Sequence, residues 1–304
     1  MRRTACAALF AWVSAGPLGV GAQQAVDTSF HPRVERATYP ANTGPLVLFD
    51  AAHNSMHSVD RSFRPFADLL RLDGYRFEAL GTNLTADSLA RAEIFVIVNV
   101  LAAENVGNWK LPTPSAYTPA EIEVVRSWVS RGGSLLLVAD HMPFPGATRE
   151  LARVFGFDFV NNFAIDTATW DPIVFRRSDG SLSAHAVTEG IDSIATFTGQ
   201  AFSAPDSAIT PLLTFGPGIT AYEPATAWEF DGVPGGSATG MLQGAARTFG
   251  AGRVVVLGEA AMLTAQVTGP ARRPMGMNAP VANQNQRFVL NVIHWLSKAD
   301  PDRE

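Results

Sequence analysis

Runs of apolar residues recur along the chain from residue 45 onward, and polar or amphipathic segments separate them. Residues 46–49, 94–100, 134–139 and 253–257 are almost continuously apolar. Short runs of this kind are typical of strands that are covered on both faces of a sheet. Residues 75–80 indicate a further strand, so the pattern predicts a sheet built from these segments.

Helical periodicity lies between these runs. The clearest helix begins at Thr118, where Pro119 suits the first helical position and Glu121 completes a capping box. Apolar side chains then recur at helical spacing. They are Ile122, Val125, Trp128 and Val129.

Two further helices are predicted with less regular ends. Ser62 is a candidate cap for one of them, with Pro65 in its first turn and Gly74 as its stop. The last helix is predicted to begin near Asn283, whose side chain could cap it while Gln286 reaches back.

The alternation of strands and helices predicts an α/β fold with a doubly wound, mainly parallel sheet. We expect residues 45–299 to form this domain. Within it, residues 160–245 are less regular, with short β-like pieces at 173–176, 210–215 and 226–230. We expect this stretch to be a β-rich excursion packed on the main domain.

The N-terminal residues have the pattern of a secretory signal. Arg2 and Arg3 supply a positive start, and an apolar run with small residues at its end follows. We expect a signal peptide at residues 1–22 and a periplasmic or secreted mature chain. A retained anchor is the alternative, but the apolar run is short for a membrane span. Residues 23–44 are polar and lack periodicity, which predicts a linker or an N-terminal arm.

Composition disfavours several classes of function. The single cysteine, Cys6, lies in the predicted signal, so the mature chain would have no disulfide, thiolate metal site or cysteine nucleophile. The chain has 23 basic and 28 acidic residues, and the basic ones are scattered. This distribution does not favour nucleic acid as a partner. No later segment is apolar enough to predict membrane insertion after signal cleavage.

Polar and ionisable residues follow four of the predicted core strands. In an open α/β sheet, ligands bind in the crevice beyond the carboxyl ends of the strands. We therefore expect these residues to converge on a polar pocket at one edge of the sheet. They are Asp50, His53, Asn54, His57, Asn99, Asp140, His141 and Glu259.

Each of these residues also has a structural alternative. Asp50, Asn99 and Asp140 could cap the turns or helices that follow them, as Asp and Asn often do. Glu259 could complement the N-terminus of a following helix. The functional interpretation gains weight because these separate roles would all have to coincide at one end of one sheet.

The same side chains could bind a divalent metal, because imidazole and carboxylate groups are ligands for zinc and for oxygen-liganded ions. The spacing of Asp50, His53 and His57 is not a specific metal motif, and HExxH is absent. Acid–base catalysis by carboxylates and a histidine without metal is the other alternative.

Known nucleophile and nucleotide motifs are absent. The chain has no G-x-S-x-G elbow and no Walker phosphate loop. The glycines at 250 and 252 precede a predicted strand and do not follow one, so they are not a dinucleotide fingerprint. Serine hydrolysis of that type and the binding of NAD or ATP are therefore not favoured.

Several segments carry a family resemblance. They are residues 50–54 (DAAHN), 64–70 (RPFADLL), 73–75 (DGY), 135–145 (LLLVADHMPFP), 185–190 (HAVTEG), 252–262 (GRVVVLGEAAM) and 285–296 (NQRFVLNVIHWL). In this order they resemble an uncharacterised bacterial domain family with a class I glutamine-amidotransferase-like fold, related to trehalose-utilisation-type proteins. The resemblance covers residues 45–298 and implies a flavodoxin-like sheet with its site at the strand ends.

The chain departs from this pattern at the nucleophile. True amidotransferases of this fold place a cysteine after a core strand, whereas Asp140 and His141 follow the comparable strand here. Glutamine hydrolysis through a thioester is therefore excluded for the mature chain. The trehalose-type relatives imply, by analogy, a carbohydrate ligand.

These observations predict an exported hydrolase that acts on a small polar or carbohydrate-like substrate. The expected catalytic residues are Asp50, His53, Asp140, His141 and Glu259. His141 or Glu259 would be the general base, and Asp50 would orient a group or bind metal. The expected substrate contacts are Asn54, His57 and Asn99.

Two alternatives stay open. The pocket could belong to a non-catalytic module that binds a carbohydrate or another small ligand, with Trp109, Tyr117 and Trp170 as aromatic platforms. The polar strand ends could also be capping groups alone, in which case substitutions at His53 and His141 would be tolerated.

Overall fold

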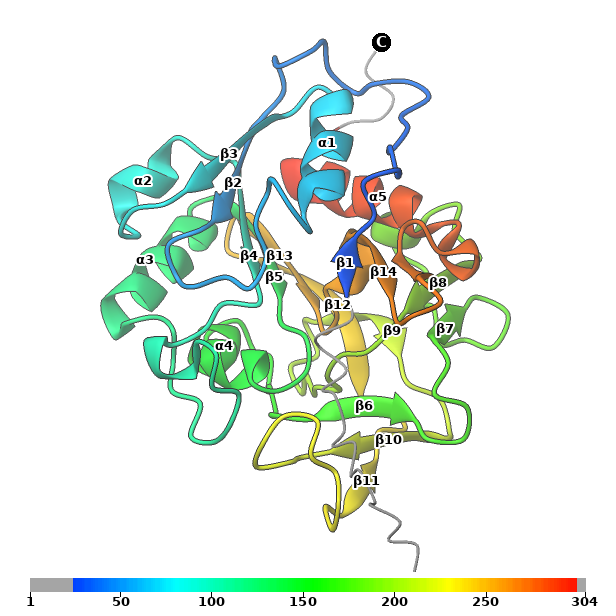
Figure 1. Ribbon diagram of the computed structural model, residues 1–304. Helices are drawn as coiled ribbons and strands as arrows, with labels where there is room; N and C mark the ends of the chain where they lie inside the picture. Colours follow the sequence, from blue (N-terminus) through cyan, green and yellow to red (C-terminus); the bar gives the residue numbers. More distant parts are fainter. Residues whose placement is uncertain (1–23, 300–304) are drawn as a thin grey trace, which may run out of the picture.

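The computed structural model describes residues 24–299, so the predicted signal peptide and Cys6 lie outside the described part. Its main sheet has seven strands in the order β3-β2-β4-β5-β13-β12-β9 (Figure 1). Their bounds are β2 Leu46–Asp50, β3 Arg76–Leu80, β4 Ile94–Val98, β5 Ser134–Val138, β9 Thr210–Thr214, β12 Leu242–Phe249 and β13 Gly252–Leu257. Strands β3, β2, β4, β5 and β13 pair in parallel, whereas β12 pairs antiparallel with both β13 and β9.

Helices cover both faces of this sheet. Helices α1 (Arg64–Leu72) and α5 (Asn285–Ser297) contribute to one hydrophobic cluster, and α2 (Ala86–Ala90), α3 (Pro119–Ser130) and α4 (Phe144–Arg153) contribute to another. We call these two sides the α5 face and the α3 face. Alternate residues of each strand enter opposite clusters, as the two-residue period of a strand requires. In β2, Val47 and Phe49 lie on the α5 face.

The helix ends follow the local sequence only in part. Helix α3 has the predicted capping box, in which the Thr118 hydroxyl accepts from the Glu121 N–H and the Glu121 carboxylate accepts from the Thr118 N–H. Helix α1 has Phe63 at its N-cap, without a side-chain cap, because the Ser62 hydroxyl bonds to His57 instead.

Helix α5 also starts differently, two residues after the predicted cap. Its N-cap is Gln284, again without a side-chain cap. The buried amide of Asn285 bonds to the backbone N–H and C=O of Ala195, which lies in the preceding β-rich stretch. A long-range contact therefore sets this helix start, and Asn283 is not the cap.

The stretch from 160 to 245 contributes strands to several sheets. Strands β9 and β12 complete the main sheet, β6, β10 and β11 form an antiparallel sheet, and β7 pairs with β8. The bounds are β6 Phe163–Asp166, β7 Ile173–Arg176, β8 Ser193–Thr196, β10 Ile219–Tyr222 and β11 Gly235–Ser237. Residues 226–230 do not form a strand, since only Thr226 makes an isolated bridge, to Lys110.

The N-terminal arm takes part in the fold. Strand β1 (Ala25–Val26) pairs antiparallel with β14 (Ala265–Thr268), which also pairs with β15 (Arg273–Gly276). Four 3₁₀ turns in the described residues are Ala103–Asn105, Ala186–Thr188, Ala261–Leu263 and Pro280–Ala282.

The α/β class predicted from the sequence is confirmed, as a mixed seven-stranded sheet with helices and additional antiparallel sheets. Within residues 24–299, none of the helices combines the length and the apolar character that crossing a membrane requires.

Candidate functional site

The polar strand ends form two separate groups. The first, which we call the Asp50 network, contains Asp50, His53, Tyr117 and Glu121. The second, which we call the Asp140 cluster, contains His57, Asn99, Asp140, His141 and Glu259. The structure thus brings the predicted residues to one edge of the sheet but divides them between two environments.

Strand alternation explains this division. Val138 and Leu257, at the ends of β5 and β13, pair in register and lie on the α5 face. Asp140 and Glu259 come two residues later, so they continue on the α5 face. Asp50 comes two residues after Leu48, which lies on the α3 face. Asp50 consequently turns towards α3.

The Asp50 network saturates its central carboxylate. Asp50 is fully buried. Its Oδ2 accepts from the Tyr117 hydroxyl at 2.5 Å and bonds to His53 Nδ1 at 2.8 Å, while its Oδ1 accepts from the Ala52 N–H at 3.0 Å. On the other side of the imidazole, His53 Nε2 lies 3.2 Å from a carboxylate oxygen of Glu121. Every member of the network therefore has a protein partner.

The two carboxylates favour the charged form of His53. Burial by itself lowers the pKa of His53, but the hydrogen bonds and charges of Asp50 and Glu121 outweigh it and raise the pKa above its usual 6.5. A histidine with opposite charges on both sides is a common source of such a shift. His53 in this setting holds β2 against the start of α3.

This shift predicts a pH-dependent contribution to stability. Because the folded-state pKa of His53 is raised, its contribution is fully present below the unfolded pKa of about 6.5 and is lost as pH rises through the folded pKa. Urea unfolding of wild type and His53→Gln should therefore show a larger difference in unfolding free energy near pH 6 than near pH 9. A difference that stays constant over this range would contradict the ion-pair account. The exposed His31, replaced by Gln, is the control.

The Asp140 cluster begins with a relay through Asn99. The Asn99 Oδ1 accepts from the Asp140 backbone N–H at 2.9 Å, and its Nδ2 donates to His57 Nε2 at 3.1 Å. His57 Nδ1 then donates to the Ser62 hydroxyl at 2.8 Å. Burial lowers the pKa of His57 to about 4, against the opposing charge of Asp140. His57 is therefore neutral at pH 7, in agreement with its one accepting and one donating nitrogen.

Glu259 has a capping role. It is fully buried, and its two carboxylate oxygens accept from the backbone N–H groups of Ala261 at 2.9 Å and Met262 at 2.7 Å. This is the structural alternative that its sequence position suggested. Burial and the nearby charge of Asp140 raise the pKa of Glu259, and the backbone N–H bonds offset part of that rise. Its oxygens face the turn and are poorly placed to act on a ligand.

His141 differs from the other histidines of the site because one of its nitrogens is left without a partner. Nδ1 donates to the Met142 carbonyl at 2.7 Å, so the other nitrogen, Nε2, carries the lone pair in the neutral ring. Within residues 24–299, the His141 ring makes a hydrogen bond only through Nδ1, and Nε2 has no partner. Burial lowers the pKa of His141 below 6.5, against the opposing charge of Asp140, which keeps the ring neutral at pH 7.

Aromatic rings hold His141 in place. Its ring stacks on Phe163 with centroids 4.2 Å apart and an interplanar angle of 13°, and Trp228 meets it edge-on at 4.7 Å. Trp109 and Phe144 also contact it. This packing fixes the ring and therefore the direction of Nε2.

A small cavity lies at His141. Asp140, Asn99, His57, Trp109 and His141 are among its lining residues, whereas Asp50, His53 and Glu259 are not. It has room for only about 40 Å³, which is enough for one or two water molecules. A water or the reacting end of a ligand would therefore sit beside His141 and Asp140.

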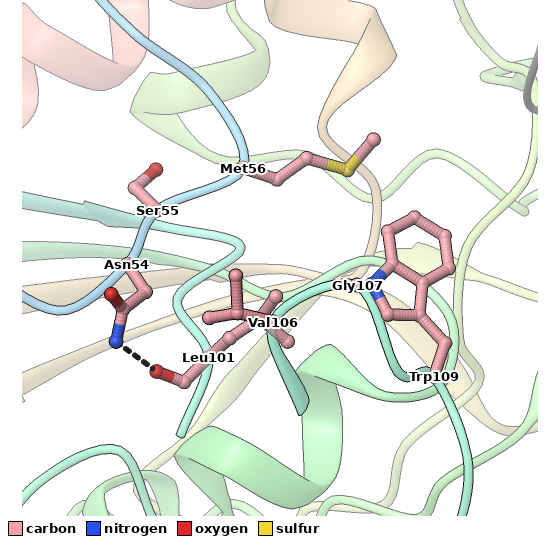
Figure 2. Close-up of a pocket in the computed structure, with 7 residues that line it drawn as sticks. All are labelled: Asn54, Ser55, Met56, Leu101, Val106, Gly107 and Trp109. Carbon is pink, nitrogen blue, oxygen red and sulfur yellow. Dashed lines mark hydrogen bonds between the residues drawn. The ribbon is translucent and has the colours of Figure 1, made fainter. Parts of the chain in front are cut away.

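A larger cavity of about 500 Å³ adjoins this one and shares Met56 and Trp109 with it. Figure 2 shows the Met56 side chain extending towards Trp109, with Asn54 at the other end. The Asn54 side-chain amide donates to the Leu101 carbonyl at 3.2 Å. The body of a ligand could occupy this space with its reacting end at His141.

The sequence does not reveal several lining residues. Gln24 of the arm, Thr198 and Trp228 line the His141 cavity, but all three come from irregular segments without periodicity. Of the three aromatic platforms suggested by the sequence, Trp109 lines the cavity and Tyr117 is buried in the Asp50 network. Trp170 is exposed and lines a neighbouring cavity. The position of a tryptophan in an irregular segment was the only sequence feature that could have indicated these lining residues.

The geometry of the described residues offers no ready metal site. Among residues 24–299, no group of three or more His, Cys, Asp or Glu side chains is arranged to hold an ion. The oxygens of Asp50 and Glu259 already accept N–H and O–H donors, so a metal would have to displace these bonds.

Comparisons with known proteins place the fold. No family model matches the sequence, and no curated protein matches it. The structure is similar to the N-terminal domain of mmIFT52, at 14% identity and a TM-score of 0.60, over 84% of this chain and 98% of that one. It is also similar to cytoplasmic protein STM1381 from Salmonella typhimurium LT2, at 12% identity and a TM-score of 0.51, over 83% and 98%.

A thuA-like protein from Bacteroides uniformis ATCC 8492 is a further structural neighbour, at 12% identity and a TM-score of 0.49, over 86% of this chain and 98% of that one. ThuA-like proteins are thus among the structural neighbours of this chain. At these identities, the similarity concerns the fold.

Proposed function

We propose that this protein hydrolyses an ester or a similar bond in a small, polar, carbohydrate-like substrate, with His141 as the general base. The observation that carries the proposal is the unpartnered Nε2 of a neutral, aromatically packed histidine at a cavity of water size. A general base must be neutral at the working pH and within hydrogen-bond reach of the proton that it takes.

The chemistry follows from this placement. His141 Nε2 takes a proton from a water in the small cavity, and the water oxygen attacks the electrophilic carbon of a substrate lying in the adjoining space. The charge of Asp140, which acts to raise the pKa of His141, stabilises the imidazolium that forms. The proton then passes to the leaving oxygen, so that an acid and an alcohol are released.

The state of the carboxylates disfavours a glycosidase. Glycoside hydrolysis needs two carboxyl groups on opposite sides of the scissile bond. Asp50 and Glu259 are fully buried and occupied by internal donors, so in this proposal they are supporting groups. His141 keeps the reactive role. The Asp140 carboxylate also accepts internal hydrogen bonds, from the His141 N–H, the Thr198 hydroxyl and the Ala260 N–H, so it acts on His141 through its charge. His57 and Asn99 position Asp140.

The second candidate is a non-catalytic binding module for the same class of ligand. The observation that favours it is the same saturation of Asp50, Asn99 and Glu259 by internal hydrogen bonds. In that case Trp109 and Asn54 would hold a ligand in the larger cavity without turnover.

Further parts of the proposal rest on the sequence. We propose that the chain is exported, that cleavage leaves Gln23 first, and that its partner is a small molecule and no nucleic acid. We also propose that the sheet is flavodoxin-like and doubly wound. If the five parallel strands are numbered by their sequence in the chain, their order across the sheet is 2-1-3-4-5, which is the flavodoxin order and supports this proposal. N-terminal sequencing of protein recovered from the periplasm or the medium tests the export.

The function is tested with a panel of acylated sugars and matched aryl glycosides. Purified mature protein is expected to release acid from at least one acylated sugar with saturation kinetics, and to leave the glycosides intact. Saturable protection against thermal unfolding without any product would favour the binding module. Release of sugar from the glycosides, with the esters untouched, would overturn the assignment to His141.

A further inference from the structure

A second cavity, which we call the Trp170 cavity, opens beside the His141 site and has no part in the proposed hydrolysis. Its volume is about 430 Å³, and Trp170, Trp228, Phe230, Asp166 and Asp171 are among its lining residues. Its walls come from β6 and the loop that follows it, from the loops after β8 and β10, and from β14 and β15. Strands β6 and β10 are neighbours in the antiparallel sheet (Figure 1). Cavities of this size commonly hold small ligands.

Both tryptophans of this cavity have a left-handed backbone. The φ angle is +56° at Trp170 and +70° at Trp228. Bulky residues rarely adopt positive φ, because the Cβ atom then crowds the carbonyl oxygen. Conformations of this kind persist where the surroundings fix them, and they concentrate at ligand-binding sites. Two such tryptophans on one cavity indicate that the position of their side chains is maintained despite an unfavourable backbone conformation.

Hydrogen bonds hold these two loops in place. The Trp170 N–H donates to the Asp166 carbonyl at 2.9 Å, and the Asp166 carboxylate accepts from the Ala168 N–H and the Thr169 hydroxyl. On the other loop, the Ala227 N–H donates to the Trp109 carbonyl at 2.8 Å. The backbone of both loops is therefore held in place without a ligand, which reduces the entropy that binding costs.

The rings face one another at steep angles. The Trp170 and Phe230 centroids are 6.5 Å apart at 59°, and those of Trp228 and Phe230 are 6.3 Å apart at 83°. Trp170 is 64% exposed and is the one aromatic residue among the exposed large hydrophobic residues of the described part. Steeply inclined faces surround a compact, rounded group better than a flat one.

The charges of the cavity are negative. Asp166 and Asp171 line it, and no Lys, Arg or His is among its lining residues. Within the described residues, the Asp171 carboxylate accepts no hydrogen bond and forms no ion pair. Aromatic faces carry partial negative charge and attract cations, and alkylated ammonium groups suit such a site because they lose their water easily. An anion would be repelled.

We propose that the Trp170 cavity binds an organic cation with an alkylated ammonium group, held between Trp170, Trp228 and Phe230 and balanced by Asp171. This site is separate from the reactive atoms of the proposed hydrolysis. It shares four lining residues with the His141 cavity, so a bound cation would lie next to that site. They are Gln24, Thr198, Trp228 and Met275.

The test compares choline with 3,3-dimethylbutan-1-ol, its neutral isostere, by titration calorimetry on the purified full chain. Choline is expected to bind with at least about tenfold higher affinity than the isostere, because only choline gains the cation–π attraction. A neutral disaccharide is the third probe. Equal affinity for the isostere, binding of the disaccharide alone, or no binding of choline at millimolar concentration would overturn the proposal.

Variants locate the site. Trp170→Ala is expected to weaken choline binding about tenfold or more, whereas Trp170→Phe keeps an aromatic face and should weaken it less. Asp171→Asn should also weaken choline, and Asp87→Asn, an exposed acid on α2, is its matched control. His141→Gln should leave choline binding intact even if hydrolysis is lost, so failure of the proposed function and failure of this site are distinguishable.

Discussion

Replacing His141 by Gln is expected to lower the turnover of the ester substrate by about 10²- to 10⁴-fold, the range that a general base typically supplies. The Gln side chain is planar and polar, and its amide N–H₂ can still donate to the Met142 carbonyl that now receives Nδ1–H. What is lost is the basic Nε2 lone pair at the small cavity. KM should change much less than kcat, because the substrate body lies in the adjoining space.

Two comparisons make this result specific. His185→Gln is the matched control, since His185 caps the 3₁₀ turn Ala186–Thr188 and is not among the residues lining the His141 cavity. Wild-type kcat should also fall as pH drops through the lowered pKa of His141, because the protonated ring cannot accept a proton. Unchanged turnover in His141→Gln, with the fold intact by circular dichroism, would remove His141 from the mechanism.

Replacing Asp50 by Ala is expected to lower the free energy of unfolding by about 3–5 kcal/mol, as removal of one partner from a buried ion pair commonly does. The substitution leaves three groups without their acceptor: the Tyr117 hydroxyl, the Ala52 N–H and the Nδ1 of His53. Urea unfolding at pH 7 measures the loss.

The variant Tyr117→Phe distinguishes the contribution of the Asp50–His53 ion pair to stability from that of the Tyr117 hydroxyl. This variant removes one hydrogen bond to Asp50 and keeps the ring against His53, so it should cost only about 1–2 kcal/mol. If Tyr117→Phe lowered the free energy of unfolding as much as Asp50→Ala, the Asp50–His53 ion pair would contribute nothing to stability. A folded and stable Asp50→Ala variant that lacks activity would instead show that Asp50 has a catalytic role and not a structural one.

The sequence by itself was sufficient for those features that local pattern controls. Continuous apolar runs predicted strands covered on both faces, because a doubly covered strand has no solvent face to make polar. The start of α3 was predicted from Thr118, Pro119 and Glu121, since a capping box is closed by neighbours within one turn. The α/β class follows from the order of such elements.

The starts of the other helices depended on distant partners. Ser62 was available as a cap for α1, but its hydroxyl bonds to His57. The start of α5 depends on Ala195, which accepts and donates hydrogen bonds with Asn285 from 90 residues away in the chain. The local sequence does not show which of several polar groups will become the hydrogen-bond partner of a given side chain.

The sequence also placed acidic and imidazole groups at one edge of the sheet, because parallel strands end on the same side. It did not show that Asp50 leaves β2 on the α3 face while Asp140 and Glu259 continue on the α5 face. It also did not show which donors each group would meet once buried. Only the packed structure decided that Glu259 and Asp50 are saturated and that His141 keeps a free nitrogen, because burial makes every polar group find whichever partner the fold brings within reach.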